Sequence, residues 1–165
     1  MQLHPSSGGI RIQAEKEPTV TCYHCKITGL DSIGPQKYAK LSGWAEWLNI
    51  NYPVNRRAIN IVLHNSSVVP ADIVHQGIPW IKGTRTVGFF DPTTRPWEIH
   101  IAARISFRQL RRIVAHEWYH ALVAAGLREV AAAEGECLCD AEEREADSFA
   151  VLVVELWLRK TLLHE

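Results

Sequence analysis

Two histidines and a glutamate with metal-binding and proton-transfer chemistry lie within the string His116-Glu117-Trp118-Tyr119-His120. At 3.6 residues per turn, His116 and His120 point from one helix face about one turn apart, so both imidazoles can bind one metal ion. Glu117 is rotated by about 100° from His116, which directs its carboxylate past the ligands toward a water. Because zinc lowers the pKa of a water, a neighbouring carboxylate can take its proton during attack on a carbonyl. The string therefore predicts a Zn²⁺ site with Glu117 as the catalytic general base.

An acidic cluster downstream of the histidines offers the third protein ligand that zinc usually has at a catalytic site. Glu143 and Asp147 are four residues apart and share a helix face. Glu143 could therefore bind zinc while Asp147 accepts a hydrogen bond from a ligand imidazole. Glu142 and Glu145 compete with Glu143 for the ligand role, so the spacing leaves three candidates.

Long helices must carry both the histidines and the acidic cluster. Ser106 and Gln109 have the spacing of a capping box and Gly126 supplies a stop, which predicts a helix of about 20 residues around the histidines. Asp140 can cap a second helix that continues almost to residue 165. Apolar residues at helical spacing predict a further helix over residues 36–50.

Strand-forming residues recur between the first helix and the histidine helix. Residues 58–64, 86–90 and 97–102 read as strands, the last two joined by a turn-forming segment at 91–96. We expect a small, largely antiparallel sheet. Together these elements predict an α+β, minimal zincin-like fold with an active-site helix and a C-terminal helix that carries the acidic ligand.

The chain divides by composition at about residue 35. Residues 1–35 are rich in Pro, Gly, Ser and Thr around Cys22 and Cys25 and show no sustained apolar period, which predicts an N-terminal arm. Residues 36–165 are expected to form the metallopeptidase domain. A second pair, Cys137 and Cys139, allows either free thiols or a four-cysteine zinc site with the first pair.

The charge balance narrows the choice of partners. Lysine plus arginine equals aspartate plus glutamate at 18 each in 165 residues, so the net charge argues against nucleic acid or an anionic membrane as the main partner. The sequence has neither the apolar run of a secretory signal nor the roughly 20 apolar residues of a membrane span. We expect a cytoplasmic protein whose partner is a protein.

Two longer segments carry a resemblance to a known family. The string from Arg111 to His120, followed by the string from Glu143 to Ala150, resembles the ImmA/IrrE-type metallopeptidases, whose pattern is an HExxH helix and then an ExxA(N/D)xFA helix. The similarity covers roughly residues 58–160. It implies that Glu143 is the third zinc ligand and that 97–102 is the edge strand before the active-site helix. It also implies cleavage of a transcriptional repressor, for example a helix-turn-helix protein.

The resulting expectation is a zinc-dependent endopeptidase that hydrolyses a peptide bond in a regulatory protein. One alternative is a catalytically idle, zinc-stabilised module that sequesters a regulator, against which the intact Glu117 argues. The other is a DNA-associated protease of the SprT-like kind, which would be expected to use a third histidine and a basic surface.

Overall fold

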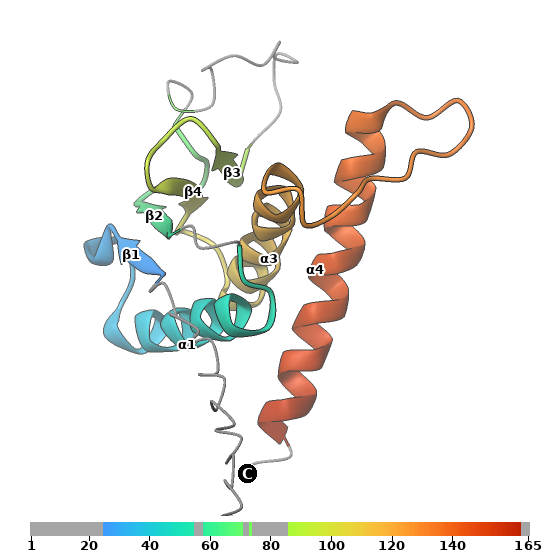
Figure 1. The fold of residues 1–165 in the computed structure, drawn as a ribbon. Coiled ribbons are helices and arrows are strands. Elements are labelled where there is room, and N and C mark those ends of the chain that lie inside the picture. Colours follow the sequence, from blue (N-terminus) through green and yellow to red (C-terminus); the bar gives the residue numbers. More distant parts are fainter. Residues whose placement is uncertain (1–24, 55–57, 71–72, 74–85, 163–165) are drawn as a thin grey trace, which may run out of the picture.

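The fold combines a small mixed sheet with helices that lie beside it (Figure 1). The computed structural model of the chain describes residues 25–54, 58–70, 73 and 86–162. Within these residues the structure is α+β, as the sequence predicts, and none of its helices is long and apolar enough to cross a membrane. In chain order the elements are β1 (Lys26–Thr28), the 3₁₀ turn η1 (Leu30–Ser32), α1 (Pro35–Asn51), β2 (Ile59–His64), β3 (Gly88–Asp91), β4 (Trp97–Ala102), α3 (Phe107–Ala124) and α4 (Leu138–Leu162).

The sheet has four strands in the order β1-β2-β4-β3, and only β3 runs antiparallel to its neighbour. The prediction of a largely antiparallel sheet was therefore wrong. β2 and β4 pair in parallel although both were expected in an antiparallel sheet. The second parallel pair, β1–β2, has two causes: β1 lies within the predicted arm, and α1 forms the crossover that such a pair requires. β1 escapes a pattern search because it has three residues, of which Ile27 alone is buried.

β4 is an interior strand, so the expectation that residues 97–102 form the sheet edge was also wrong. β4 pairs in parallel with β2 on one side and antiparallel with β3 on the other. The edge strand beside the histidine helix is β3, which follows from the turn at residues 92–96 that folds β3 back along β4. α3 packs against both β3 and β4.

One face of the sheet and the inner faces of the helices form the core. Ile61 and Ile99 of the sheet and Leu41 of α1 are fully buried there. Trp44 of α1 is also buried, and its indole donates a hydrogen bond to the carbonyl of Arg111 in α3, 3.2 Å away. The core therefore fixes α3 between the sheet and α4 (Figure 1).

The ends of α3 follow the signals in its sequence. Ser106 caps the first turn, and its hydroxyl accepts a hydrogen bond from the backbone N–H of Gln109, which completes the predicted capping box. Gly126 has a φ of +71°, which a residue without Cβ adopts freely, and the backbone N–H of Leu127 closes the helix end on the carbonyl of Leu122. The predicted start and stop of this helix are confirmed.

α4 begins three residues earlier than its sequence predicts. The helix starts at Leu138, and the backbone N–H of Asp140 donates to the Sγ of Cys137 at 3.3 Å. Cys137 thus occupies the capping position that was assigned to Asp140, which lies inside the first turn.

Candidate metal centre

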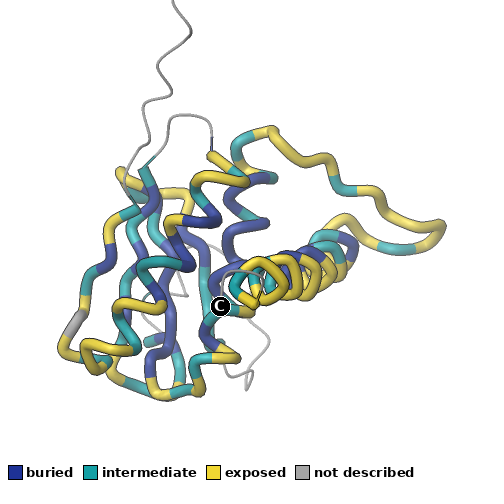
Figure 2. Tube along the Cα trace, turned by 90° about the horizontal axis from the view of Figure 1, so that it is seen from below, coloured by how far each residue is buried: buried dark blue, intermediate teal, exposed yellow. Residues whose placement is uncertain are grey.

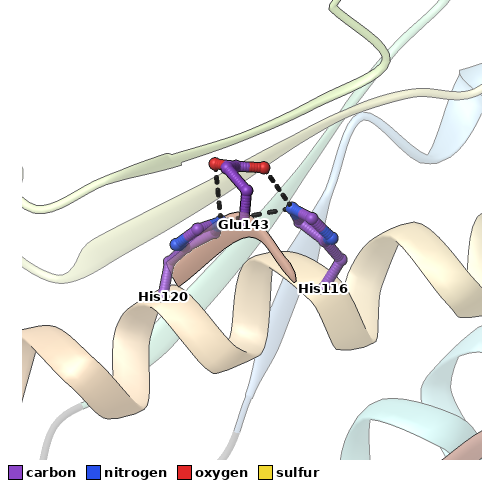
Figure 3. Close-up of side chains that lie close together, drawn as sticks. All are labelled: His116, His120 and Glu143. Carbon is purple, nitrogen blue, oxygen red and sulfur yellow. Dashed lines mark hydrogen bonds and ion pairs between the residues drawn. The ribbon is translucent and has the colours of Figure 1, made fainter. Parts of the chain in front are cut away.

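Three side chains from two helices point toward one another beside the C-terminal half of α3 (Figure 3). His116 and His120 come from successive turns of α3, and Glu143 comes from the second turn of α4. Their ligand atoms lie within 4.8 Å of one another and form the group among the described residues that could hold a metal ion. The structure therefore brings together the three residues that the sequence proposes as ligands.

The separations between these ligand atoms fit a tetrahedral site. The two Nε2 atoms of His116 and His120 are 3.2 Å apart, and carboxylate oxygens of Glu143 lie 3.2 Å from the first and 3.4 Å from the second. Ligands placed about 2.0–2.1 Å from a tetrahedral zinc ion are roughly 3.3–3.4 Å from one another. Two nitrogens and one oxygen also match the donor set that zinc accepts at catalytic sites.

The outward-facing nitrogen of each imidazole contacts a carboxylate of α4. The Nδ1 of His116 lies 3.2 Å from Asp147, which is the contact that the four-residue spacing of Asp147 and Glu143 predicts. The Nδ1 of His120 lies 2.7 Å from Glu142. Both contacts favour the tautomer that carries a proton on Nδ1 and presents the Nε2 lone pair to a metal. Asp147 is held in turn by Arg112, 3.6 Å away.

The role of Glu142 in this arrangement was missed at the level of sequence, where it was weighed as a zinc ligand. The contact of Glu142 with His120 depends on how α4 crosses α3. This crossing directs the adjacent residues Glu142 and Glu143 to different nitrogens of the histidine pair. Glu143 contacts the metal-facing nitrogens while Glu142 reaches the far side of His120. One segment of α4 therefore supplies the candidate acidic ligand and both carboxylates that contact the Nδ1 atoms.

The carboxylates and imidazoles of the candidate metal site shift one another's pKa values. Burial lowers the pKa of His120, but hydrogen bonds to Glu143 and the charge of Glu117 outweigh it and raise the pKa to about 9. The pKa of His116 is raised by the same competition. The hydrogen bonds from both histidines lower the pKa of Glu143. Without a metal the cluster therefore holds protons that a divalent ion would displace.

Glu117 lies beside the ligands but belongs to the buried part of α3. Its side chain is 8% exposed, and this burial raises the pKa of its carboxyl group. The backbone N–H of Phe90 in β3 donates a hydrogen bond to the carboxylate. A carboxylate with a raised pKa, fixed next to a metal site, has the properties of a general base.

Gly88 allows β3 to approach this carboxylate closely. A Cβ atom at position 88 would lie 2.8 Å from the Oε1 of Glu117 and 2.4 Å from the Cγ2 of Ile113. A side chain at this position would therefore push the edge strand away from α3. Hydrophobic periodicity does not reveal the need for a glycine at position 88, because the contact joins a strand residue to a helix residue 29 positions further along the chain.

A pocket of about 770 Å³ opens between β3, α3 and the start of α4. The three candidate ligands and Glu117 line one side, while Phe90 and Val123 contribute apolar walls. Trp118, inside the histidine motif, points the other way: it is fully buried and donates a hydrogen bond to the carbonyl of Tyr52, 2.9 Å away. The pocket is large enough for several atoms of a substrate chain.

The other acidic and phenolic candidates have separate roles. Tyr119 donates a hydrogen bond of 2.5 Å to Glu145, which also accepts one from the backbone of Ala131. Glu145 therefore ties the loop between α3 and α4 to α3 and is not directed at the histidines. The same bond uses the hydroxyl proton of Tyr119.

The three described cysteines do not join the candidate metal group. Cys25 precedes β1, and burial raises the pKa of its thiol to about 12. Cys137 caps α4, and Cys139 is exposed at the rim of the pocket. Cys22 lies outside the described residues.

A second group of histidines lies on the face of the sheet opposite the helices. The Nδ1 of His100 is 3.0 Å from the Nε2 of His64, and the Nε2 of His100 is 3.2 Å from Glu98. Asn60 donates to the same carboxylate at 3.2 Å. His100 is 6% exposed, and burial is the main cause of its lowered pKa.

Comparisons of the chain with protein-family models, with curated proteins and with solved structures found no match. The fold and site by themselves define an α+β protein with a two-histidine, one-glutamate group that could hold a metal ion.

Proposed function

We propose that this protein is a zinc-dependent endopeptidase with a minimal, gluzincin-like architecture related to the ImmA/IrrE-type enzymes. The observation that carries the proposal is the convergence of His116, His120 and Glu143 beside the buried carboxylate of Glu117. A structural zinc site normally has four protein ligands and no use for an adjacent base, whereas a catalytic site keeps one position open. Zn²⁺ bound by these residues would supply Lewis acidity toward a water and a carbonyl oxygen.

The residues of the chain then divide the remaining work. Glu117 accepts the proton of the attacking water and delivers it to the leaving nitrogen, a transfer that its raised pKa favours. Asp147 and Glu142 hold the two imidazoles in orientation. Phe90 and Val123 form apolar walls that limit the water next to the scissile bond.

The substrate is an extended peptide segment of another protein. Within the described residues β3 pairs with β4 alone, so the outer edge of β3 offers backbone groups beside the pocket. A peptide strand can pair with such an edge, and side-chain pockets then select its sequence. On the family resemblance, we propose a cytoplasmic transcriptional repressor of the helix-turn-helix class as the substrate.

The alternatives of a different class predict other features. A SprT-like protease would use a third histidine, whereas the third group here is the carboxylate of Glu143. A sequestering module would not need Glu117 between the pocket and the metal ligands.

The experiment compares the zinc-loaded protein with its Glu117→Gln variant. Both are incubated with the repressor that is encoded nearest to the gene, and products are identified by mass spectrometry. The amide keeps the shape of the side chain but cannot accept the proton, so the variant should retain zinc and lose at least about 100-fold of the cleavage rate. Binding by both proteins with cleavage by neither would instead support a sequestering module. Equal cleavage by both would refute the role of Glu117.

A further inference from the structure

α4 has an outer face with several large apolar side chains that are exposed among the described residues. Its inner face packs Val153 and Phe149 into the core and places Trp157 against Trp44 and Trp47 of α1. Figure 2 shows exposed residues recurring along the helix, between buried and intermediate ones. Exposed large apolar side chains are concentrated in its C-terminal half, with exposures of 45, 55, 40, 40 and 72% for Val151, Leu152, Leu156, Leu158 and Leu162, here called the outer stripe.

Such a stripe indicates an interaction surface. Single exposed leucines are common on proteins, but a contiguous group within twelve residues of one helix is typical of a face that binds a partner. The stripe lies more than two helical turns beyond Glu143, so a partner seated on it leaves the metal pocket open.

The charges within the outer stripe indicate which partner fits. Glu155 and Arg159 are four residues apart, exposed, and 3.9 Å from each other. An acidic and a basic residue on one helix face are complementary to the same pair on an antiparallel copy of that helix. A twofold axis level with position 157 places Glu155 beside the partner's Arg159 and Leu152 beside the partner's Leu162. The net charge of zero adds no long-range repulsion between two copies.

We propose that the outer stripe of α4 is the interface of a symmetric homodimer in which the two α4 helices pack antiparallel. A closed twofold interface uses the same patch on both subunits, which is the condition that this self-complementary pattern meets. The antiparallel direction also carries the two metal pockets to opposite ends of the paired helices. Each subunit then keeps its own site and its own β3 edge.

Charge reversal tests this arrangement without disturbing the core. Glu155→Arg places two arginines beside those of its copy, and Arg159→Glu places two glutamates beside those of its copy. Each variant alone should be monomeric in a concentration series by analytical ultracentrifugation, where the unmodified chain approaches twice its mass of 18.6 kDa. Mixed in equal amounts, the two variants should form a heterodimer, because each arginine then meets a glutamate of the other chain.

The mixing step separates this interface from an effect within one helix. Both variants lose the ion pair between residues 155 and 159 of the same chain, so only contact between chains can restore association. Lys160→Glu is the matched control: the residue is exposed on the same turn but rotated by about 100° from Arg159, so its dimer should persist. Circular dichroism verifies that all variants are folded.

Two outcomes would overturn the proposal. An unmodified chain that stays monomeric throughout the series would mean that the stripe is covered by another segment of the chain or by a different partner. A dimer that both single reversals leave intact would place the interface elsewhere on the molecule.

Discussion

The described residues include two clusters of two histidines and a carboxylate, one on α3 and α4 and the other on the outer face of the sheet. In the helical cluster the Nε2 atoms of His116 and His120 and the carboxylate of Glu143 surround a common point. In the sheet cluster, His100 contacts His64 through one nitrogen and Glu98 through the other. The same residue types therefore place their ligand atoms around one point in the helical cluster, whereas in the sheet cluster they form a row of hydrogen-bonded side chains.

The difference lies in which ring nitrogen each carboxylate contacts. Asp147 and Glu142 contact the Nδ1 atoms of the helical histidines and leave both Nε2 atoms directed inward. Both nitrogens of His100 are already engaged, so a metal could bind there only after a hydrogen bond is broken. Composition alone would rate the two clusters equally, whereas the direction of the lone pairs distinguishes them.

The strongest way to break this comparison is to remove one histidine from each cluster. His116→Ala or His120→Ala leaves too few ligands, and we expect the bound Zn²⁺, one per chain, to be lost. His100→Gln should keep a full equivalent. Elemental analysis after gel filtration measures the content directly. Equal zinc in all of these proteins would show that the metal binds elsewhere.

The same measurement distinguishes the acidic residues. Glu143→Ala should lose zinc as the histidine variants do. Glu145→Ala should retain it, because this carboxylate contacts Tyr119 and the backbone of Ala131. Loss of metal from Glu145→Ala with retention in Glu143→Ala would reverse the assignment of the third ligand.

A sharper version of the comparison concerns the orienting carboxylates. Asp147→Asn and Glu142→Gln should each weaken zinc binding by roughly 10- to 100-fold, because each carboxylate fixes the orientation and basicity of one ligand imidazole. Glu98→Gln makes the equivalent change in the sheet cluster and should leave the affinity unchanged. Competition with a chromophoric chelator gives the three constants. Unchanged affinity in the first two variants would make their contacts to the histidines incidental.

The two clusters should also have opposite effects on stability in the metal-free protein. The pKa of His120 rises to about 9 on folding, so its contribution is fully present below the unfolded pKa of about 6.5. That contribution is lost as the pH rises from about 6.5 through 9, and it amounts to at most about 3.5 kcal/mol at 1.4 kcal/mol per pKa unit. Urea titrations across this range should show the decline. His120→Gln should flatten it, and an unaltered decline would assign it to another group.

The smallest expected effect comes from His100, whose pKa is lowered mainly by burial. The folded protein holds this ring neutral, so the unfolded state binds more protons as the pH falls below about 6.5. The free energy of unfolding should therefore decline as the pH falls below about 6.5. His100 binds at most one proton per chain on unfolding, which limits the slope of this decline. His100→Gln should reduce that acid slope in urea titrations, while His120→Gln should not. A slope that His100→Gln leaves unchanged would contradict the prediction.

Local signals in the sequence anticipated the helices well. The capping box at Ser106 and the glycine at 126 gave both ends of α3, and two of the three predicted strands agree with β2 and β4 to within one residue. Local signals could not predict the order of the strands in the sheet. Pairing between β2 and β4 joins residues 38 positions apart, and the short β1 contributes one buried side chain to the pattern.

The contacts of the candidate site likewise fall into those that helical spacing predicts and those that depend on how the elements pack. The four-residue spacings place His116 beside His120 and Asp147 on the face of Glu143, because they are properties of single helices. The contact between Glu142 and His120 depends on how α4 crosses α3, and the approach of Gly88 to Glu117 depends on the packing of a strand on a helix. Neither follows from periodicity.

The length of α4 has an optical consequence. The helix that presents Glu143 near its start also holds Trp157 near its end, where the indole packs at 5.6 and 5.7 Å, between ring centroids, from those of Trp44 and Trp47. Because a helix transmits displacement along its axis, any shift of α4 during metal binding also moves one indole against two others. Intrinsic tryptophan emission is therefore a label-free reporter of events at a site that contains no tryptophan itself.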